Sequence, residues 1–258
     1  MLANSVKVCL LAALSSMAEA DNYKVDGEKD VRLRFNSNNK FKILQLTDIQ
    51  MGENPELDNM TLDMIEEILT KERPDLVAIT GDMVSGQAMP KHDKSNSWWR
   101  KKYMRIIERI RDKDIAHAIT AGYHDYEADI LSERFMIVGH DGMFEFGVTK
   151  YNPYTWFDKE LSHQFTYMLP IESPDDPENI LARAWFFGTG RADCMGKGGM
   201  DCVRRDQVQW FKEESEKIPE YEATRGNGIA FMHHALQEHM MLVNDYPIRG
   251  QKRDYSTC

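Results

Sequence analysis

The stretch Phe41–Glu53, FKILQLTDIQMGE, sets the first element of the fold. Its apolar run, FKILQLT, predicts a buried β-strand that ends at Asp48. In open α/β sheets, ligands bind beyond the carboxyl ends of the strands, so Asp48 stands where a metal ligand would stand. Gln50 follows two residues later, where a metal site usually has a second strong ligand, most often histidine. Two interpretations stay open: a metal site with one ligand changed, or a strand end with an ordinary aspartate.

Two more apolar runs of the same kind follow along the chain. The run DLVAIT ends in Gly81-Asp82, and the run IAHAITA ends in Gly122-Tyr123-His124-Asp125. The segments between the three runs have the length and periodicity of helices. This alternation of strand and helix predicts parallel strands joined by right-handed helical crossovers, which bring the three strand ends to one edge of a sheet.

Both intervening helices have a predicted apolar face. Asn54 and Pro55 suit the N-cap and first turn of the first helix. Apolar residues at helical spacing predict the buried faces: Leu57, Met60, Met64, Ile65, Ile68 and Leu69 in the first helix, and Trp99, Tyr103, Ile106, Ile107 and Ile110 in the second.

The second half of the chain has a more β-like pattern. Strands are predicted at 163–169, 181–189 and 228–232, and the last of these ends in His233-His234. A helix is predicted at 206–218 and a shorter one at 237–243. Because no repeat or long linker interrupts this pattern, we predict a single domain over 41–258, preceded by a lead-in segment over 21–40.

Composition narrows the classes of function. The chain has 258 residues, of which 42% are apolar, enough for one large core or two small ones. Its formal net charge of −10 argues against nucleic acid as a partner, because phosphate backbones need a basic face, and it disfavours anionic membranes. A phosphate ester remains possible as a substrate, since bound metal cations can reverse the local field.

The N-terminus predicts a secretory signal peptide over 1–20. Lys7 supplies a basic region, the hydrophobic stretch VCLLAALSSMA follows, and Ala18-Glu19-Ala20 is a small-x-small cleavage pattern. The alternative is an N-terminal core or membrane helix, but the apolar stretch is too short to span a bilayer. We therefore expect the secretory pathway, with an extracellular, lysosomal or vacuolar destination and no membrane span after cleavage.

Cysteine usage agrees with an oxidising compartment. Cys194 and Cys202 bracket the glycine-rich segment CMGKGGMDC, which predicts a disulfide between them. A zinc-binding pair is the alternative, although no second pair of Cys or His lies nearby in the sequence. Cys258 then has no partner, which suggests a dimer bond or a chain that stops early. Asn59 begins a glycosylation sequon, Asn-Met-Thr.

The polar strand ends together predict a metal site. They carry Asp48, Asp82, His124-Asp125 and His233-His234, and carboxylates with imidazoles suit Fe, Mn or Zn. In the order and spacing of five motifs the chain resembles the calcineurin-like metallophosphoesterases, and within them the secreted branch related to purple acid phosphatases. Those motifs are LTDIQMGE, AITGDMVSG, AGYHDYEADI, WFFGTG followed by DQVQWF, and FMHHALQE.

The resemblance implies a fold and a set of roles. The fold would be an α+β, four-layer αββα sandwich of two mixed sheets flanked by helices. Two divalent or trivalent metal ions would lie above the strand ends, with Asp48 binding the first, Asp82 bridging both and His233 binding the second. His124 would contact the phosphate or act as general acid, and Asp125 would orient it.

Several positions depart from the family pattern. Gln50 stands where the family has histidine, and Tyr123 stands where it has a metal-binding asparagine. The family also has a later Gly-His-x-His motif, whereas this chain has no histidine after His239, so we expect the fold to be incomplete at the C-terminus. These departures weaken the expected metal site.

Two functions therefore remain open. The first is a metal-dependent phosphoesterase that hydrolyses phosphomonoesters at a weakened dinuclear site. The second is a catalytically inactive pseudophosphatase that acts as a secreted binding protein. The oligomeric state does not follow from the sequence.

Overall fold

The computed structural model describes residues 31–91, 98–127, 146–191, 193–194, 200–219 and 227–236. The predicted signal peptide, the part of the lead-in segment before residue 31, the predicted helix at 237–243 and Cys258 lie outside the described residues. Among the helices in the described part, none combines the length and the apolar character needed to cross a membrane.

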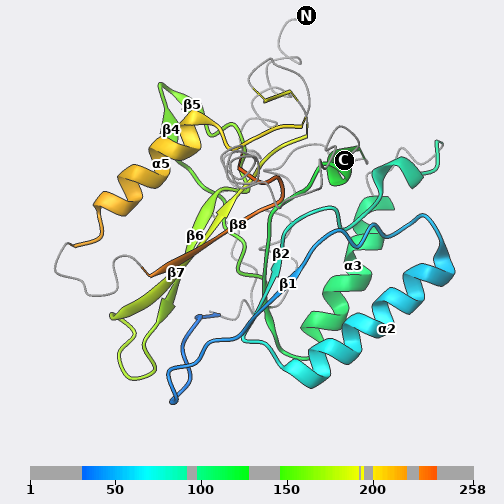
Figure 1. Ribbon diagram of the computed structural model, residues 1–258, viewed down its shortest axis with the longest axis horizontal. Coiled ribbons are helices and arrows are strands. Elements are labelled where there is room, and N and C mark those ends of the chain that lie inside the picture. The colour runs from blue at the N-terminus through cyan, green and yellow to red at the C-terminus, as the bar shows by residue number, and fades with distance from the viewer. Residues whose placement is uncertain are drawn as a thin grey trace, which may run out of the picture.

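The first sheet is parallel, with strand order β1-β2-β3. The helices α2 and α3 connect its strands and lie together on one side of it (Figure 1). The bounds of these elements are Ile43–Leu46 for β1, Pro55–Glu72 for α2, Leu76–Ile79 for β2, Trp98–Arg111 for α3 and Ala116–Ile119 for β3. Two 3-10 helices follow the strand ends, Gly86–Ala88 (η2) after β2 and His124–Glu127 (η3) after β3.

The second sheet is mixed, with strand order β6-β7-β8. Strands β6 and β7 are antiparallel neighbours, whereas β7 and β8 are parallel and are connected through α5. The bounds are Thr155–Trp156 for β4, Lys159–Glu160 for β5, Tyr167–Glu172 for β6, Ile180–Phe187 for β7, Arg205–Glu216 for α5 and Gly228–Met232 for β8. Strands β4 and β5 form a separate short hairpin.

The alternation of side chains along the central strands shows how the layers stack. Leu76 and Ala78 of β2 join a core shared with Ala184 and Phe186 of β7, so the two sheets pack face to face. The intervening residues of β2 face the helices α2 and α3. Those of β7 pack against α5, which lies on the opposite side of the molecule (Figure 1). The predicted αββα sandwich is confirmed, although the first sheet is wholly parallel in the described residues.

The buried face of α2 differs from the predicted one. Leu57, Met60 and Met64 are more than half exposed, although helical spacing predicted them in the core. The buried face comprises Asp58, Leu62, Ile65 and Leu69. The prediction is confirmed for Ile65 and Leu69. It was wrong for the three exposed residues because apolar residues occupy two stripes of this helix and a buried carboxylate lies on the packed one.

The N-terminal end of α2 is built as predicted. The Asn54 side chain accepts hydrogen bonds from the backbone N–H groups of Glu56 and Leu57, and Pro55 opens the first turn. The buried Asp58 carboxylate accepts from Gly52 N at 2.9 Å and from Lys102 Nζ at 2.9 Å. This contact joins the loop after β1 to both helices.

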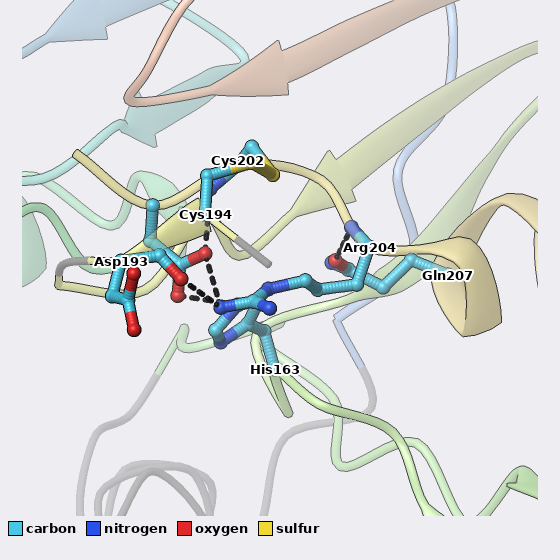
Figure 2. Close-up of a disulfide and its surroundings, with 7 residues drawn as sticks. His163, Asp193, Cys194, Cys202, Arg204 and Gln207 are labelled. Atoms are coloured by element: carbon cyan, nitrogen blue, oxygen red, sulfur yellow. Dashed lines mark hydrogen bonds and ion pairs between the residues drawn. A yellow bond between two sulfur atoms is a disulfide. The ribbon is translucent and has the colours of Figure 1, made fainter. Parts of the chain in front are cut away.

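The predicted disulfide between Cys194 and Cys202 is present, with 5.3 Å between the Cα atoms. Beside it, the side chains of Arg204 and His163 lie next to each other (Figure 2). Both contact Asp201, whose carboxylate oxygens are 2.6 Å from the Arg204 guanidinium and 3.2 Å from His163 Nε2. The two sulfur atoms and Asp201 also cluster closely enough to suggest a metal site. Because the sulfurs are bonded to each other, they do not serve as thiolate ligands.

Candidate metal centre

The loops that follow β1 and β2 run side by side beyond the sheet. Asp48 N donates to Gly81 O at 3.0 Å, and Gln50 N donates to Asp82 O at 2.9 Å. Asp48, Gln50 and Asp82 all have φ between 51° and 55°, in the left-handed region. Such backbone costs free energy in non-glycine residues and is concentrated at functional sites. The pairing of the loops stabilises this geometry and turns both aspartates out of the strands.

Asp125 holds the second of these loops in place. Its buried carboxylate accepts hydrogen bonds from the backbone N–H groups of Asp82, Met83, Val84 and Gly122 at 2.8 to 3.3 Å. Burial raises the pKa of Asp125 to about 6, helped by the nearby charge of Asp82 and opposed by these hydrogen bonds. Asp125 is therefore a positioning residue for the Asp82 loop.

Three of the predicted ligands come together. Asp48, Asp82 and His233 each have a ligand atom within 4.8 Å of those of the others. His233 lies directly after β8, so the group unites ends of strands from both sheets. His233 Nδ1 is 2.9 Å from the carbonyl oxygen of Thr80, to which it donates, and Nε2 lies on the side of Asp82, 3.4 Å from its Oδ2. A backbone carbonyl that fixes the tautomer in this way is typical of metal-binding histidines.

Asp82, which is buried, and His233, which is partly buried, shift each other's pKa. Burial alone would raise the pKa of Asp82, but the hydrogen bond and charge of His233 outweigh it, and the pKa is lowered. Burial alone would lower the pKa of His233, but the hydrogen bond and charge of Asp82 outweigh it, and the pKa is raised. Asp82 is thus held as a carboxylate, the form in which it binds a cation.

Two glycines allow the loops to approach this closely. A Cβ added to Gly122 would lie 2.4 Å from Asp82 Oδ1 and 2.8 Å from His233 Cε1. A Cβ added to Gly81 would lie 2.4 Å from the backbone nitrogen of Gly122. No side chain fits between the loops without moving the ligands, so both glycines form the floor of the site.

His124 is held next to this group, though by a different residue from the predicted one. Its backbone N–H donates to Asp82 Oδ1 at 2.7 Å. Its ring Nδ1 is 2.6 Å from Glu127 Oε2, three residues later on the same 3-10 turn. Asp125 was expected to orient this ring, but its carboxylate is occupied by backbone N–H groups, and Glu127 takes that place.

The two positions that depart from the family pattern lie at the same edge. Gln50 is tied to Asp82 through the backbone hydrogen bond between the loops. The Tyr123 ring packs edge-on against the His124 ring, with 5.1 Å between centroids, and the Arg191 guanidinium lies 5.9 Å from its centre. Tyr123 therefore contributes an aromatic surface beside His124 where an amide ligand was expected.

His234, which follows the candidate ligand His233, is positioned differently. Its backbone N–H donates to Thr189 Oγ1 at 3.2 Å, and its side chain is buried. Burial lowers the pKa of His234, and the charge of His233 adds to this effect. The group of possible ligands contains the first histidine of the pair, as the sequence predicted.

The donor set fits a metal ion. Two carboxylates and one imidazole with a fixed tautomer are ligand types that Fe, Mn and Zn accept. The group lies at the carboxyl ends of parallel strands, above a floor of glycine. Within the described residues, Asp48, Asp82 and His233 could hold one ion, and the tyrosine at position 123 leaves a second ion with fewer ligands.

Sequence reasoning missed Glu127 and Arg191. Glu127 follows His124 by three residues, and an acid at that spacing on a helical turn reaches the ring, which was a usable signal. Arg191 follows β7 in the other sheet, and the side chain reaches Glu127 Oε1 at 3.9 Å only because the two sheets bring their strand ends together. No local pattern predicts that meeting.

Comparison with known proteins agrees with this geometry. A family model described as calcineurin-like phosphoesterase matches residues 41–251. A Saccharomyces cerevisiae protein, Phosphatase DCR2, is 23% identical over 84% of this chain and 39% of its own length. Two Arabidopsis thaliana proteins, named Probable inactive purple acid phosphatase 14 and 28, are 23% and 24% identical. Their alignments cover 88% and 71% of this chain.

The chain spans only part of these relatives. The aligned share is 39% of the yeast protein, and 61% and 50% of the two plant proteins. At identities this low, the comparisons establish the family and leave the activity of this chain to be derived from its own residues.

Proposed function

The chain belongs to the calcineurin-like phosphoesterase family, and from this premise we propose that it is a metal-dependent phosphoesterase acting on phosphomonoesters. The observation that carries the proposal is the meeting of Asp48, Asp82 and His233 at strand ends of the two sheets. The family generally uses two metal ions, and Fe, Mn or Zn suits these ligands. When bound, such ions supply Lewis-acid chemistry that favours attack of water on phosphorus.

Each residue of the candidate metal centre has a separate role in this proposal. Asp48, Asp82 and His233 hold the metal, with Asp82 kept ionised by its histidine neighbour. Glu127 fixes the His124 ring through Nδ1, which leaves Nε2 to give a proton to the leaving oxygen of the ester. Asp125 keeps the Asp82 loop in its left-handed conformation through backbone hydrogen bonds.

A second candidate is a binding protein without turnover. It is favoured by Gln50 and Tyr123, which occupy positions where the family has metal ligands. Two relatives also carry the words "probable inactive" in their names. In this case the group of polar side chains at the strand ends would bind a phosphate-bearing ligand and release it unchanged.

We also propose that the protein enters the secretory pathway. The sequence 1–20 supports this, and so does the disulfide between Cys194 and Cys202, since such bonds persist in oxidising compartments. Asn59 is exposed on α2 and is proposed as a glycosylation site, although its Oδ1 accepts a hydrogen bond from Arg105. Mass spectrometry of the secreted protein before and after glycosidase treatment tests both points.

The test of the proposed activity is hydrolysis of a chromogenic phosphate monoester by the protein supplied with Mn, Fe or Zn. We expect metal-dependent turnover, and we expect His124→Ala and His124→Asn to lower kcat by about 100-fold or more, the usual contribution of a general acid. Unchanged thermal unfolding would show that both variants are folded. Equal kcat in wild type and variants would contradict the proposal, and no turnover with any metal would favour the binding protein.

A further inference from the structure

Arg191 lies at the edge of the candidate metal centre but belongs to the other sheet. It follows β7 by a few residues, and its side chain is 53% exposed. Its guanidinium lies over the Tyr123 ring, 5.9 Å from the centroid, and 3.9 Å from Glu127 Oε1. The other oxygen of Glu127 holds the His124 ring at 2.6 Å. Arg191 is thus one side chain away from the proposed proton donor.

The backbone that leads to Arg191 is fixed. Gly190 has φ +63°, and a Cβ there would lie 2.3 Å from His163 Cε1 and 2.4 Å from Asp201 Oδ2. The Asp201 carboxylate is in turn 2.6 Å from the Arg204 guanidinium. Arg204 lies near the disulfide (Figure 2). A side chain at position 190 would therefore displace His163 or Asp201. The residue that follows in the chain, Arg191, lies beside Glu127 and Tyr123.

The contacts of Arg191 contribute too little to the stability of the fold to explain its position. An exposed ion pair at 3.9 Å contributes about 0 to 1 kcal/mol, and Glu127 already has His124 and Gln87 as closer partners. The guanidinium keeps donors available to solvent. Arginine binds tetrahedral oxyanions through two parallel N–H groups, which suits a phosphoryl group better than it suits a single oxygen.

The charge of the site calls for such a group. Asp48 and Asp82 belong to the group of possible metal ligands, and Glu127 contacts the His124 ring beside that group, so a dianionic phosphate monoester bound there would meet several carboxylates. A site with Gln50 and Tyr123 in place of two ligands depends more strongly on other cationic groups to hold that anion. Arg191 supplies a permanent positive charge there, because arginine stays protonated at all physiological pH values.

We propose that Arg191 is a substrate-binding residue that donates hydrogen bonds to the phosphoryl oxygens of the phosphate ester. Glu127 and Tyr123 hold the guanidinium beside His124, so the anion is bound between Arg191 and the metal ligands. This inference rests on the proposed function, since it assumes that the candidate metal centre accepts a phosphoryl group.

The test measures binding of inorganic phosphate to the metal-supplied protein by isothermal titration calorimetry, and so does not depend on turnover. Arg191→Ala is compared with Arg191→Lys and with Arg111→Ala. Arg111 is a partly exposed arginine at the end of α3 that pairs with Asp112, so its removal changes the net charge equally. Loss of charge-assisted hydrogen bonds predicts a roughly 10- to 100-fold weaker phosphate Kd for Arg191→Ala. We expect partial recovery in Arg191→Lys and no change in Arg111→Ala.

The outcomes separate the two claims. If wild type binds phosphate and Arg191→Ala binds it equally well, the role of Arg191 is refuted while the phosphoesterase proposal stands. An equal loss in Arg111→Ala would also refute it, because the effect would then be one of net charge. If wild type binds no phosphate with any metal, the proposed function fails and this inference fails with it.

Discussion

At the scale of single residues, backbone conformation decides what the aspartates can do. Asp48 and Asp82 follow predicted strands, so their candidacy could be inferred from the sequence. Their left-handed φ values and the hydrogen bonds between their loops could not, because these depend on pairing between segments more than 30 residues apart. Asp125 shows the same limit, since its motif pointed to His124 whereas its carboxylate holds the Asp82 loop.

The first prediction concerns Gly122. In Gly122→Ala the new Cβ would meet Asp82 Oδ1 at 2.4 Å and His233 Cε1 at 2.8 Å, so at least one ligand must move. We expect the variant to fold and to bind clearly less metal than wild type, because coordination requires well-placed ligands. Elemental analysis of the purified variant measures this directly.

Gly228→Ala is the matched control, since its Cβ would meet the Trp185 side chain at 3.1 Å, far along β8 from His233. Metal content equal to that of wild type in both variants would show that Gly122 is not a constraint on the site.

At the scale of elements, the order of strands and helices followed from the apolar periodicity. The α3 face was predicted fully, because Trp99, Tyr103, Ile106, Ile107 and Ile110 form a single stripe, and all are buried. The α2 face was misassigned, because the helix carries two apolar stripes. Asp58 belongs to the stripe that is buried. It is buried because its hydrogen-bond partners lie in another helix and in the loop after β1. Such a tertiary contact leaves no periodic signal.

The second prediction concerns this contact. Asp58→Ala removes the acceptor for Gly52 N–H and leaves Lys102, with Arg105 at 3.6 Å, without its buried counter-ion. Breaking one partner out of a buried ion pair costs about 3 kcal/mol of unfolding free energy. Urea denaturation measures the loss.

Asp63→Ala on the exposed side of α2 is the control and should change stability by no more than about 0.5 kcal/mol. Equal stability of the two variants would mean that the Asp58 contact does not hold the loop to the helices.

At the scale of the whole molecule, packing two sheets face to face creates the site, because it brings the end of β8 to the ends of β1 and β2. The resemblance to the family predicted this arrangement, whereas local patterns predicted only the separate strands. The same packing brings Arg191 to Glu127 and Tyr123, and this meeting could not be predicted from either segment alone.

The third prediction is a pH dependence of stability that comes from the core. Burial lowers the pKa of His117 in β3 to about 4, against about 6.5 in an unfolded chain. The unfolded state therefore takes up a proton first as the pH falls, and stability is lost between about pH 6.5 and about pH 4. The expected loss from this residue between pH 7 and pH 5 is about 2 kcal/mol.

In His117→Leu the loss of unfolding free energy between pH 7 and pH 5 should be smaller by about 2 kcal/mol than in the wild type. This difference does not depend on how stable the variant is at pH 7. Urea denaturation of both proteins at the two pH values measures the difference. An identical pH dependence in the variant would show that another group causes the acid sensitivity.

The most direct test of the account is the metal content of the folded protein, determined by elemental analysis together with Asp82→Ala and His233→Ala. We predict a stoichiometric amount of bound Fe, Mn or Zn in the wild type and its loss in both variants, with circular dichroism showing that they remain folded. A folded wild type that binds none of these metals when they are supplied, or variants that retain as much metal as the wild type, would contradict the central claim.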